Sequence, residues 1–196
     1  MNDINSLTDN QKHLLCMLRD KDYETYIHSL RVKDLTNDMI NIMNAFAVTD
    51  YSKKDRMIIC KGAILHDIGK LYIDSGVLKK ADVLSDDEMR HMSQHTRLGY
   101  EAIKNELSDD EHEVIKNICL YHHERLDGRG YEKKAELPMY IQIVSVCDVF
   151  DALHSDRIYR KGLNKDECFA IIRGRGRGGA FGGMLVDFLE KVVCDI

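Results

Sequence analysis

Helix-forming signals run through almost the whole chain, and they constrain its fold more than any other feature. Between residues 23 and 46, apolar side chains recur mostly at steps of three and four residues, as on one face of an amphipathic helix. A serine followed three residues later by an acid, the capping-box pattern that opens a helix, recurs at Ser52, Ser85 and Ser108. Strand patterns are almost absent. The sequence therefore predicts an all-α bundle of about seven helices.

The second half of the chain continues this pattern. The single proline, Pro138, stands where a first helical turn tolerates it, and a helical apolar pattern that includes Asp148 follows it. Shorter helices are expected near residues 164–172 and 184–193. No repeat or long linker divides the 196 residues, so we expect an N-terminal helical extension over residues 1–21 and one domain over residues 22–196.

The composition of the chain limits which binding partners and which cellular compartment we expect. The net charge of −5 gives no general attraction to nucleic acid, and no apolar stretch is long enough to span a bilayer. We therefore expect neither duplex nucleic acid nor a membrane as a partner. The 6 cysteines contain no Cys-x-x-Cys pair, which is typical of free thiols in a reducing compartment. The expected location is the cytoplasm.

The 9 histidines fall into two groups. Four have no partner pattern and are interpreted as structural: His13, His91, His112 and His154. The others stand near acids or near each other: His28 four residues after Glu24, His66 directly before Asp67, His95, and the adjacent His122 and His123. Taken singly, each is more typical of structure than of catalysis, because His and Asp often cap helices or bridge buried polar groups. Their combination points to a shared site.

The segment AILHDIGK shows what such a site would hold. Asp67 follows a mostly apolar run at the buried end of a predicted helix, where an unpaired carboxylate and imidazole would cost several kcal/mol. Two divalent cations would compensate, because an aspartate can bridge a metal pair while neutral imidazoles fill the outer positions. The adjacent His122 and His123, at the end of another helix, can both turn toward the same pocket. The sequence thus predicts a metal site inside a helical bundle.

The order of these residues resembles the HD-GYP branch of the HD superfamily of metal-dependent phosphohydrolases. The matching segments are HSLRV at 28–32, LHDIGK at 65–70, HHERLDGRGY at 122–131 and CDVFDALHSDRIYRK at 147–161. The resemblance extends from about residue 22 to about residue 190. It implies an all-helical domain that binds two or three divalent metal ions, commonly iron or manganese, and hydrolyses the cyclic dinucleotide cyclic di-GMP with metal-activated hydroxide.

The resemblance also implies roles for particular residues. The implied metal ligands, with Asp67 as the bridge, are His28, His66, Asp67, His95, His122, His123 and Asp148. Glu24 matches a glutamate found in family members that bind a third metal, and a solvated charge is the alternative. Lys70, Arg157 and Arg160 resemble substrate-contacting groups, and Lys70 would also act with Asp67 in catalysis. For the two arginines, a surface salt bridge is the alternative.

The chain departs from the family pattern in two places. Gly130, Tyr131 and Glu132 stand where the family has Gly-Tyr-Pro, so the backbone N–H that proline lacks is present. This change affects the expected substrate and any signalling-protein partner at the loop 124–136. Near the C-terminus, Gly182 and Gly183 replace an acid and a proline, which predicts a looser start to the last helix. The preceding RGRGRGG segment predicts a flexible basic loop.

Two other functions stay open beside the phosphodiesterase. One is a catalytically weak module that senses a cyclic dinucleotide or docks a signalling protein, which the altered loop favours and the intact ligand residues disfavour. The other is a different HD-superfamily enzyme, such as a nucleotide phosphohydrolase or a di-iron oxygenase, because similar helical sites support both chemistries. The HHERLDGRGY and SDRIYR segments favour the phosphodiesterase.

Overall fold

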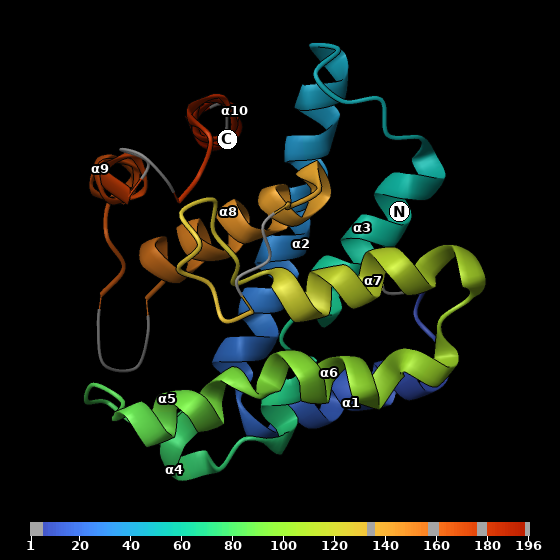
Figure 1. The fold of residues 1–196 in the computed structure, drawn as a ribbon, viewed down its shortest axis with the longest axis vertical. Helices are drawn as coiled ribbons and strands as arrows, with labels where there is room; N and C mark the ends of the chain where they lie inside the picture. Colours follow the sequence, from blue (N-terminus) through green and yellow to red (C-terminus); the bar gives the residue numbers. More distant parts are fainter. Residues whose placement is uncertain (1–5, 133–135, 157–160, 176–179, 195–196) are drawn as a thin grey trace.

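The structure, a computed structural model, describes residues 6–132, 136–156, 161–175 and 180–194. Over these ranges the regular structure is helical without strands, which confirms the predicted all-α fold (Figure 1). The α-helices are α1 Asp9–Lys21, α2 Tyr23–Ala45, α3 Lys53–Leu65, α4 Ser75–Leu78, α5 Asp86–Ser93, α6 His95–Ile103, α7 Asp109–Tyr121, α8 Met139–His154, α9 Lys165–Arg175 and α10 Gly183–Cys194. Two short 3-10 helices, η2 Ile68–Tyr72 and η3 Lys104–Glu106, connect them.

Capping boxes open the helices where the sequence predicts them. The backbone N–H of Asp55 donates to Ser52 Oγ at 3.1 Å, and the Asp55 carboxylate accepts the Ser52 N–H at 2.9 Å. The same reciprocal pattern opens α5 at Ser85 and α7 at Ser108. Because each cap satisfies N–H groups that have no partner within the helix, these local signals fix where the helices begin.

The described residues contain a few helices beyond the predicted number of about seven. One reason is a break after Ser93, where the helix opened by Ser85 ends and α6 starts afresh. There the Thr96 hydroxyl donates to the Ser93 carbonyl at 3.0 Å, and His95 Nδ1 lies 2.7 Å from the Met92 carbonyl. These side chains compete with the backbone for its acceptors, which bends the chain. The four-residue α4 is a further addition, and α1 lies within residues 1–21, where the sequence predicts helical structure outside those seven helices.

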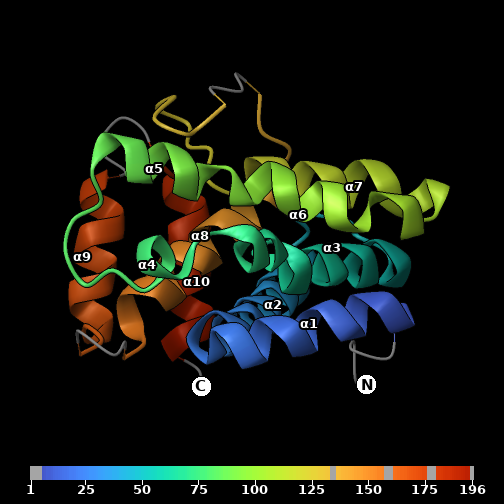
Figure 2. The ribbon, with the colours of Figure 1, turned by 90° about the horizontal axis from the view of Figure 1, so that it is seen from below.

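Helix α2 is the central element of the bundle. It contacts α1, α3, α8 and α10, and Figure 2 shows α5 to α7 along one side of the molecule with α1 along the opposite side. Two apolar clusters fill the interior. One is formed mainly by α2, α8, α9 and α10, and the other by α1, α3, η2, α6 and α7. Several polar side chains, among them His66, Asp67 and His122, are also buried in this interior.

A glycine allows η2 to approach α6 closely. A Cβ added to Gly69 would lie 2.5 Å from the backbone nitrogen of Gly99 and closer still to the carbonyl oxygen of His95. Both approaches are far inside van der Waals contact, so only glycine fits between the two backbones. The contact places the turn that carries Asp67 directly beside the first residue of α6. Gly69 thus positions the site although it contributes no side chain.

Two further features of the fold concern the cysteines and the capacity of the helices to cross a membrane. All 6 cysteines are free thiols, as predicted, and four of them, Cys60, Cys119, Cys147 and Cys168, are buried. Among the described residues, no helix has the combination of length and apolar character that crossing a membrane requires.

Candidate metal centre

The His66–Asp67 pair lies at the buried junction of α3 and η2. His66 caps the C-terminus of α3, and Asp67 precedes the first residue of η2. The preceding stretch from Ile58 to Leu65 is entirely buried, so it carries the pair into the protein interior, where 0% of His66 and 1% of Asp67 is exposed. A carboxylate this deep needs a compensating positive charge.

The two carboxylate oxygens of Asp67 face two different sets of histidines. Oδ1 lies 3.3 Å from His95 Nε2 and 3.9 Å from His122 Nε2. Oδ2 lies 3.4 Å from His66 Nε2 and 3.8 Å from His28 Nε2. Two groups of potential ligand atoms, each within 4.8 Å of one another, result: Asp67, His95, His122 and His123, and His28, His66 and Asp67. Asp67 belongs to both groups, which is the arrangement that a bridging carboxylate requires.

Backbone carbonyls orient three of these imidazoles. The Nδ1 atoms of His66 and His95 each lie 2.7 Å from the carbonyl oxygen three residues earlier, and His122 Nδ1 lies 3.0 Å from the carbonyl four residues earlier. A carbonyl can only accept a proton, so we assign the ring proton to Nδ1 in each case. Each Nε2 then carries a lone pair that points toward Asp67, as a metal ligand does.

This donor set fits divalent cations. The Nε2 atoms of His95 and His122 lie 3.3 Å apart, and under the assigned tautomers neither holds a proton for the other. His66 Nε2 and Asp67 Oδ1 are buried without a hydrogen-bond partner. Each such atom costs about 1–3 kcal/mol. A cation on each side of Asp67 would satisfy all of these atoms, and imidazole with carboxylate is a common donor set for divalent transition metals.

Burial and nearby charges give Asp67, His95 and His123 the protonation states that metal ligands need. Burial raises the pKa of Asp67, but Lys70 and the neighbouring histidines outweigh it and hold that pKa well below the usual value. Burial lowers the pKa of His95 to about 4 and that of His123 to about 3. The carboxylate is therefore ionised and these imidazoles are neutral near neutral pH.

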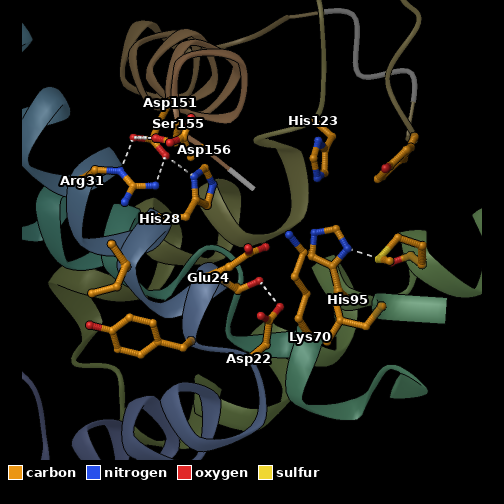
Figure 3. A pocket seen from close by; sticks show the side chains of 16 residues that line it. Asp22, Glu24, His28, Arg31, Lys70, His95, His123, Asp151, Ser155 and Asp156 are labelled. Atoms are coloured by element: carbon orange, nitrogen blue, oxygen red, sulfur yellow. Dashed lines mark hydrogen bonds and ion pairs between the residues drawn. The ribbon is translucent and has the colours of Figure 1, made fainter. Parts of the chain in front are cut away.

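His28 is oriented by an aspartate that the sequence reasoning did not identify. Its Nδ1 lies 2.7 Å from Asp151 Oδ2 (Figure 3). Its Nε2 lies 3.0 Å from Asp148 Oδ1. Burial lowers the pKa of His28, but the two aspartates outweigh it and raise the pKa to about 9. Asp151 also accepts hydrogen bonds from Arg31 at 2.6 and 2.9 Å. Its position one helical turn after Asp148 is a weak sequence signal, because that spacing is ordinary for a helix.

Removing Asp151 is expected to weaken metal binding without unfolding the protein. In Asp151→Ala, His28 loses the acceptor that fixes its ring, and loss of such a partner typically lowers metal affinity about 10–100-fold. Titration of chelator-treated protein with Mn²⁺ measures the change. Asp187→Ala is the control, because it also removes an Asp–Arg pair, but one that lies at the protein surface. Equal Mn²⁺ affinity in Asp151→Ala and wild type would show that Asp151 does not position His28.

A pocket opens onto this site. Its volume is about 400 Å³, within the range of small-molecule sites, and its lining includes Glu24, His28, Lys70, His95 and His123 (Figure 3). Lys70 Nζ lies 2.6 Å from Asp67 Oδ2. Glu24 lines the pocket without belonging to either ligand group.

Two predicted site residues have no structural description. Arg157 and Arg160 lie outside the described residues.

Comparison with known proteins identifies the family. The model of the HD domain matches residues 25–153. The chain belongs to the HD domain family. This match spans most of the chain, from Thr25 in α2 to Leu153 in α8. It contains all seven residues that the sequence resemblance implies as ligands. The resemblance drawn from the sequence is thereby confirmed at the level of the family.

Curated relatives of this HD domain carry phosphodiesterase names. The chain is 40% identical over 146 residues to the cyclic di-GMP phosphodiesterase response regulator RpfG of Xanthomonas campestris, covering 71% of the chain and 37% of the relative. It is 33% identical over 148 residues to the 3'3'-cGAMP-specific phosphodiesterase 3 of Vibrio cholerae, covering 74% of the chain and 30% of the relative. The chain thus spans about a third of the length of these relatives.

A solved structure supports the fold. The HD domain of the phosphodiesterase PgpH from L. monocytogenes superposes with a TM-score of 0.63 at 18% identity. The match covers 93% of this chain and 95% of that one. At this identity the likeness shows that both chains share the HD fold.

Proposed function

We propose that this HD domain is a metal-dependent phosphodiesterase that hydrolyses a cyclic dinucleotide, with cyclic di-GMP as the foremost substrate. The observation that carries the proposal is the position of Asp67. Its two carboxylate oxygens face two separate groups of histidine ligand atoms beneath one pocket. The names of the curated relatives, cyclic di-GMP and 3'3'-cGAMP phosphodiesterases, support the same substrate class.

The proposed ligands are the seven residues His28, His66, Asp67, His95, His122, His123 and Asp148. Glu24 is the proposed ligand of a third ion, because it lines the pocket beside His28. Iron and manganese are the proposed metals, since mixed imidazole and carboxylate donors suit both. Bound ions would supply Lewis-acid catalysis, which activates the attacking water and neutralises charge on the phosphoryl oxygens.

Lys70 is the proposed catalytic cation of the chain itself. Its ammonium group lines the pocket and is held 2.6 Å from Asp67 Oδ2. A phosphodiester gains negative charge on its oxygens as the bond to the leaving 3'-oxygen breaks, so a fixed cation there stabilises the transition state more than the ground state. Arg157 and Arg160 are proposed to bind the substrate phosphates or bases.

The proposed function predicts turnover of cyclic dinucleotides by metal-loaded protein. Protein reconstituted with Fe²⁺ or Mn²⁺ should linearise cyclic di-GMP, and product formation is followed by chromatography. The relatives include both cyclic di-GMP and 3'3'-cGAMP phosphodiesterases, so 3'3'-cGAMP is the second substrate to be tested. A linear phosphodiester without a nucleobase is the control. Tight binding of a cyclic dinucleotide without hydrolysis would contradict the proposal and favour the catalytically weak module that senses a cyclic dinucleotide.

Two further expectations accompany this function. A signalling-protein partner at the loop 124–136 stays a prediction, and residues 133–135 of that loop lie outside the described residues. The cytoplasm is the proposed location, which the buried free thiols support because they suit a reducing compartment.

A further inference from the structure

The Gly-Tyr-Glu segment of this chain folds back onto a buried acid. Glu124, directly after the histidine pair, is 1% exposed, and the backbone N–H of Glu132 donates to its Oε1 at 2.8 Å. A Cβ added to Gly130 would lie 2.6 Å from the Cα of Glu124 and closer still to its carboxyl carbon, so only glycine can cover this acid. The N–H that anchors the segment is the one that a proline at position 132 would lack.

The side chain of Glu132 reaches across to helix α6. Its Oε1 accepts hydrogen bonds from Arg97 Nε at 3.0 Å and Nη2 at 2.8 Å, and its Oε2 accepts from Nη2 at 2.8 Å. Arg97 lies two residues after His95, so the contact joins the loop to the helix that carries a proposed metal ligand. The Arg97 side chain is 68% exposed and that of Glu132 only 28%. Several hydrogen bonds from one guanidinium fix the carboxylate in orientation as well as in distance.

Tyr131, between the two anchored residues, forms part of the pocket wall. Its ring centroid lies 4.7 Å from that of His123 and 6.4 Å from that of His95. It lines the pocket that contains Lys70. A tyrosine in this place would contact a substrate that reaches the proposed metal centre. Any change in how the loop is held therefore moves a surface against which that substrate packs.

We infer that Glu132 is a positioning residue that holds Tyr131 at the pocket wall, through its carboxylate on Arg97 and its backbone N–H on Glu124. These two polar contacts hold the backbone at position 132 in place, where the Gly-Tyr-Pro pattern has a proline ring that fixes the φ angle. Glu132 acts through Tyr131 and touches no reacting atom. The expected consequence for catalysis rests on the proposed function, while the position of the tyrosine does not.

The position of residue 131 can be measured without any substrate. The chain contains no tryptophan, so Tyr131→Trp introduces a single indole as a reporter of the pocket wall. In that background, Arg97→Ala should lower the fluorescence anisotropy of the indole and shift its emission to longer wavelength, because the ring becomes more mobile and more exposed. The charge-reversed double variant Arg97→Glu, Glu132→Arg should restore both signals. Arg90→Ala is the control, since the Arg90 side chain is 71% exposed, close to that of Arg97, and forms an ion pair with Asp87 on the neighbouring helix.

Hydrolysis kinetics on the natural Tyr131 background form the second arm. Arg97→Ala should raise KM for the cyclic dinucleotide about 2–5-fold, the scale of one exposed ion pair, with kcat changed less than twofold and with charge reversal restoring KM. Unchanged anisotropy and emission of the introduced indole in Arg97→Ala would overturn the inference whether or not the protein hydrolyses a cyclic dinucleotide. Absence of all hydrolysis would overturn the proposed function and leave the fluorescence arm to decide this inference.

Discussion

Asp67→Ala is expected to lose both metal ions, while Glu24→Ala loses at most one. Protein purified without chelator should hold at least two transition-metal ions per chain, because Asp67 belongs to both ligand groups. Its removal deprives each ion of a charged ligand, whereas Glu24 lies outside both groups. Elemental analysis of the purified variants, normalised to protein concentration, measures the difference.

Asp67→Asn provides the matched control for this result. The amide keeps the volume of the side chain but offers only one oxygen, so we expect it to retain more metal than alanine and less than wild type. Circular dichroism of each variant checks that the helices remain. A folded Asp67→Ala protein with the metal content of wild type would contradict the bridging role of Asp67.

Lys70→Met is expected to lower kcat about 100-fold or more and to change substrate affinity much less. This is the scale of losing one preorganised donor to a developing negative charge. The methionine retains the approximate length of the apolar stem while it removes the ammonium group that lies 2.6 Å from Asp67 Oδ2. Single-turnover hydrolysis and equilibrium binding, measured at matched metal loading, separate the two effects.

Lys104→Met is the control for the lysine substitution. Lys104 forms a contact with Glu101 at the same 2.6 Å, three residues apart, on the protein surface. Its loss should leave kcat unchanged. If Lys70→Met instead weakened cyclic-dinucleotide binding and left kcat unchanged, Lys70 would serve to bind the substrate and not to stabilise the transition state.

The parts of the fold that local chemistry determines could be predicted from the sequence. A capping box such as Ser52 with Asp55 contains both partners within four residues, so its geometry follows from the residue types alone. The break between α5 and α6 could not be predicted in the same way. It depends on His95 and Thr96 occupying backbone carbonyls, and the same residue types occur within unbroken helices elsewhere in the chain.

The residues of the candidate site likewise differ in whether the sequence alone could identify them. The histidines and Asp67 stood out because their residue types and their order in the chain are distinctive. Asp151 did not stand out, because its contact with His28 joins residues 123 positions apart and its spacing from Asp148 is ordinary for a helix. The contact between Arg97 and Glu132 likewise joins residues 35 positions apart. Such pairs become visible only when the helices are placed together.

The stepwise metal titration of chelator-treated protein tests the central claim most directly. Metal bound per chain and hydrolysis of cyclic di-GMP are measured in the same samples as Mn²⁺ is added. If two ions that share Asp67 perform the reaction, hydrolysis should be negligible without metal and should rise mainly as the occupancy passes from one to two ions per chain. Full hydrolysis by metal-free protein, or by protein that binds no more than one ion, would contradict the account.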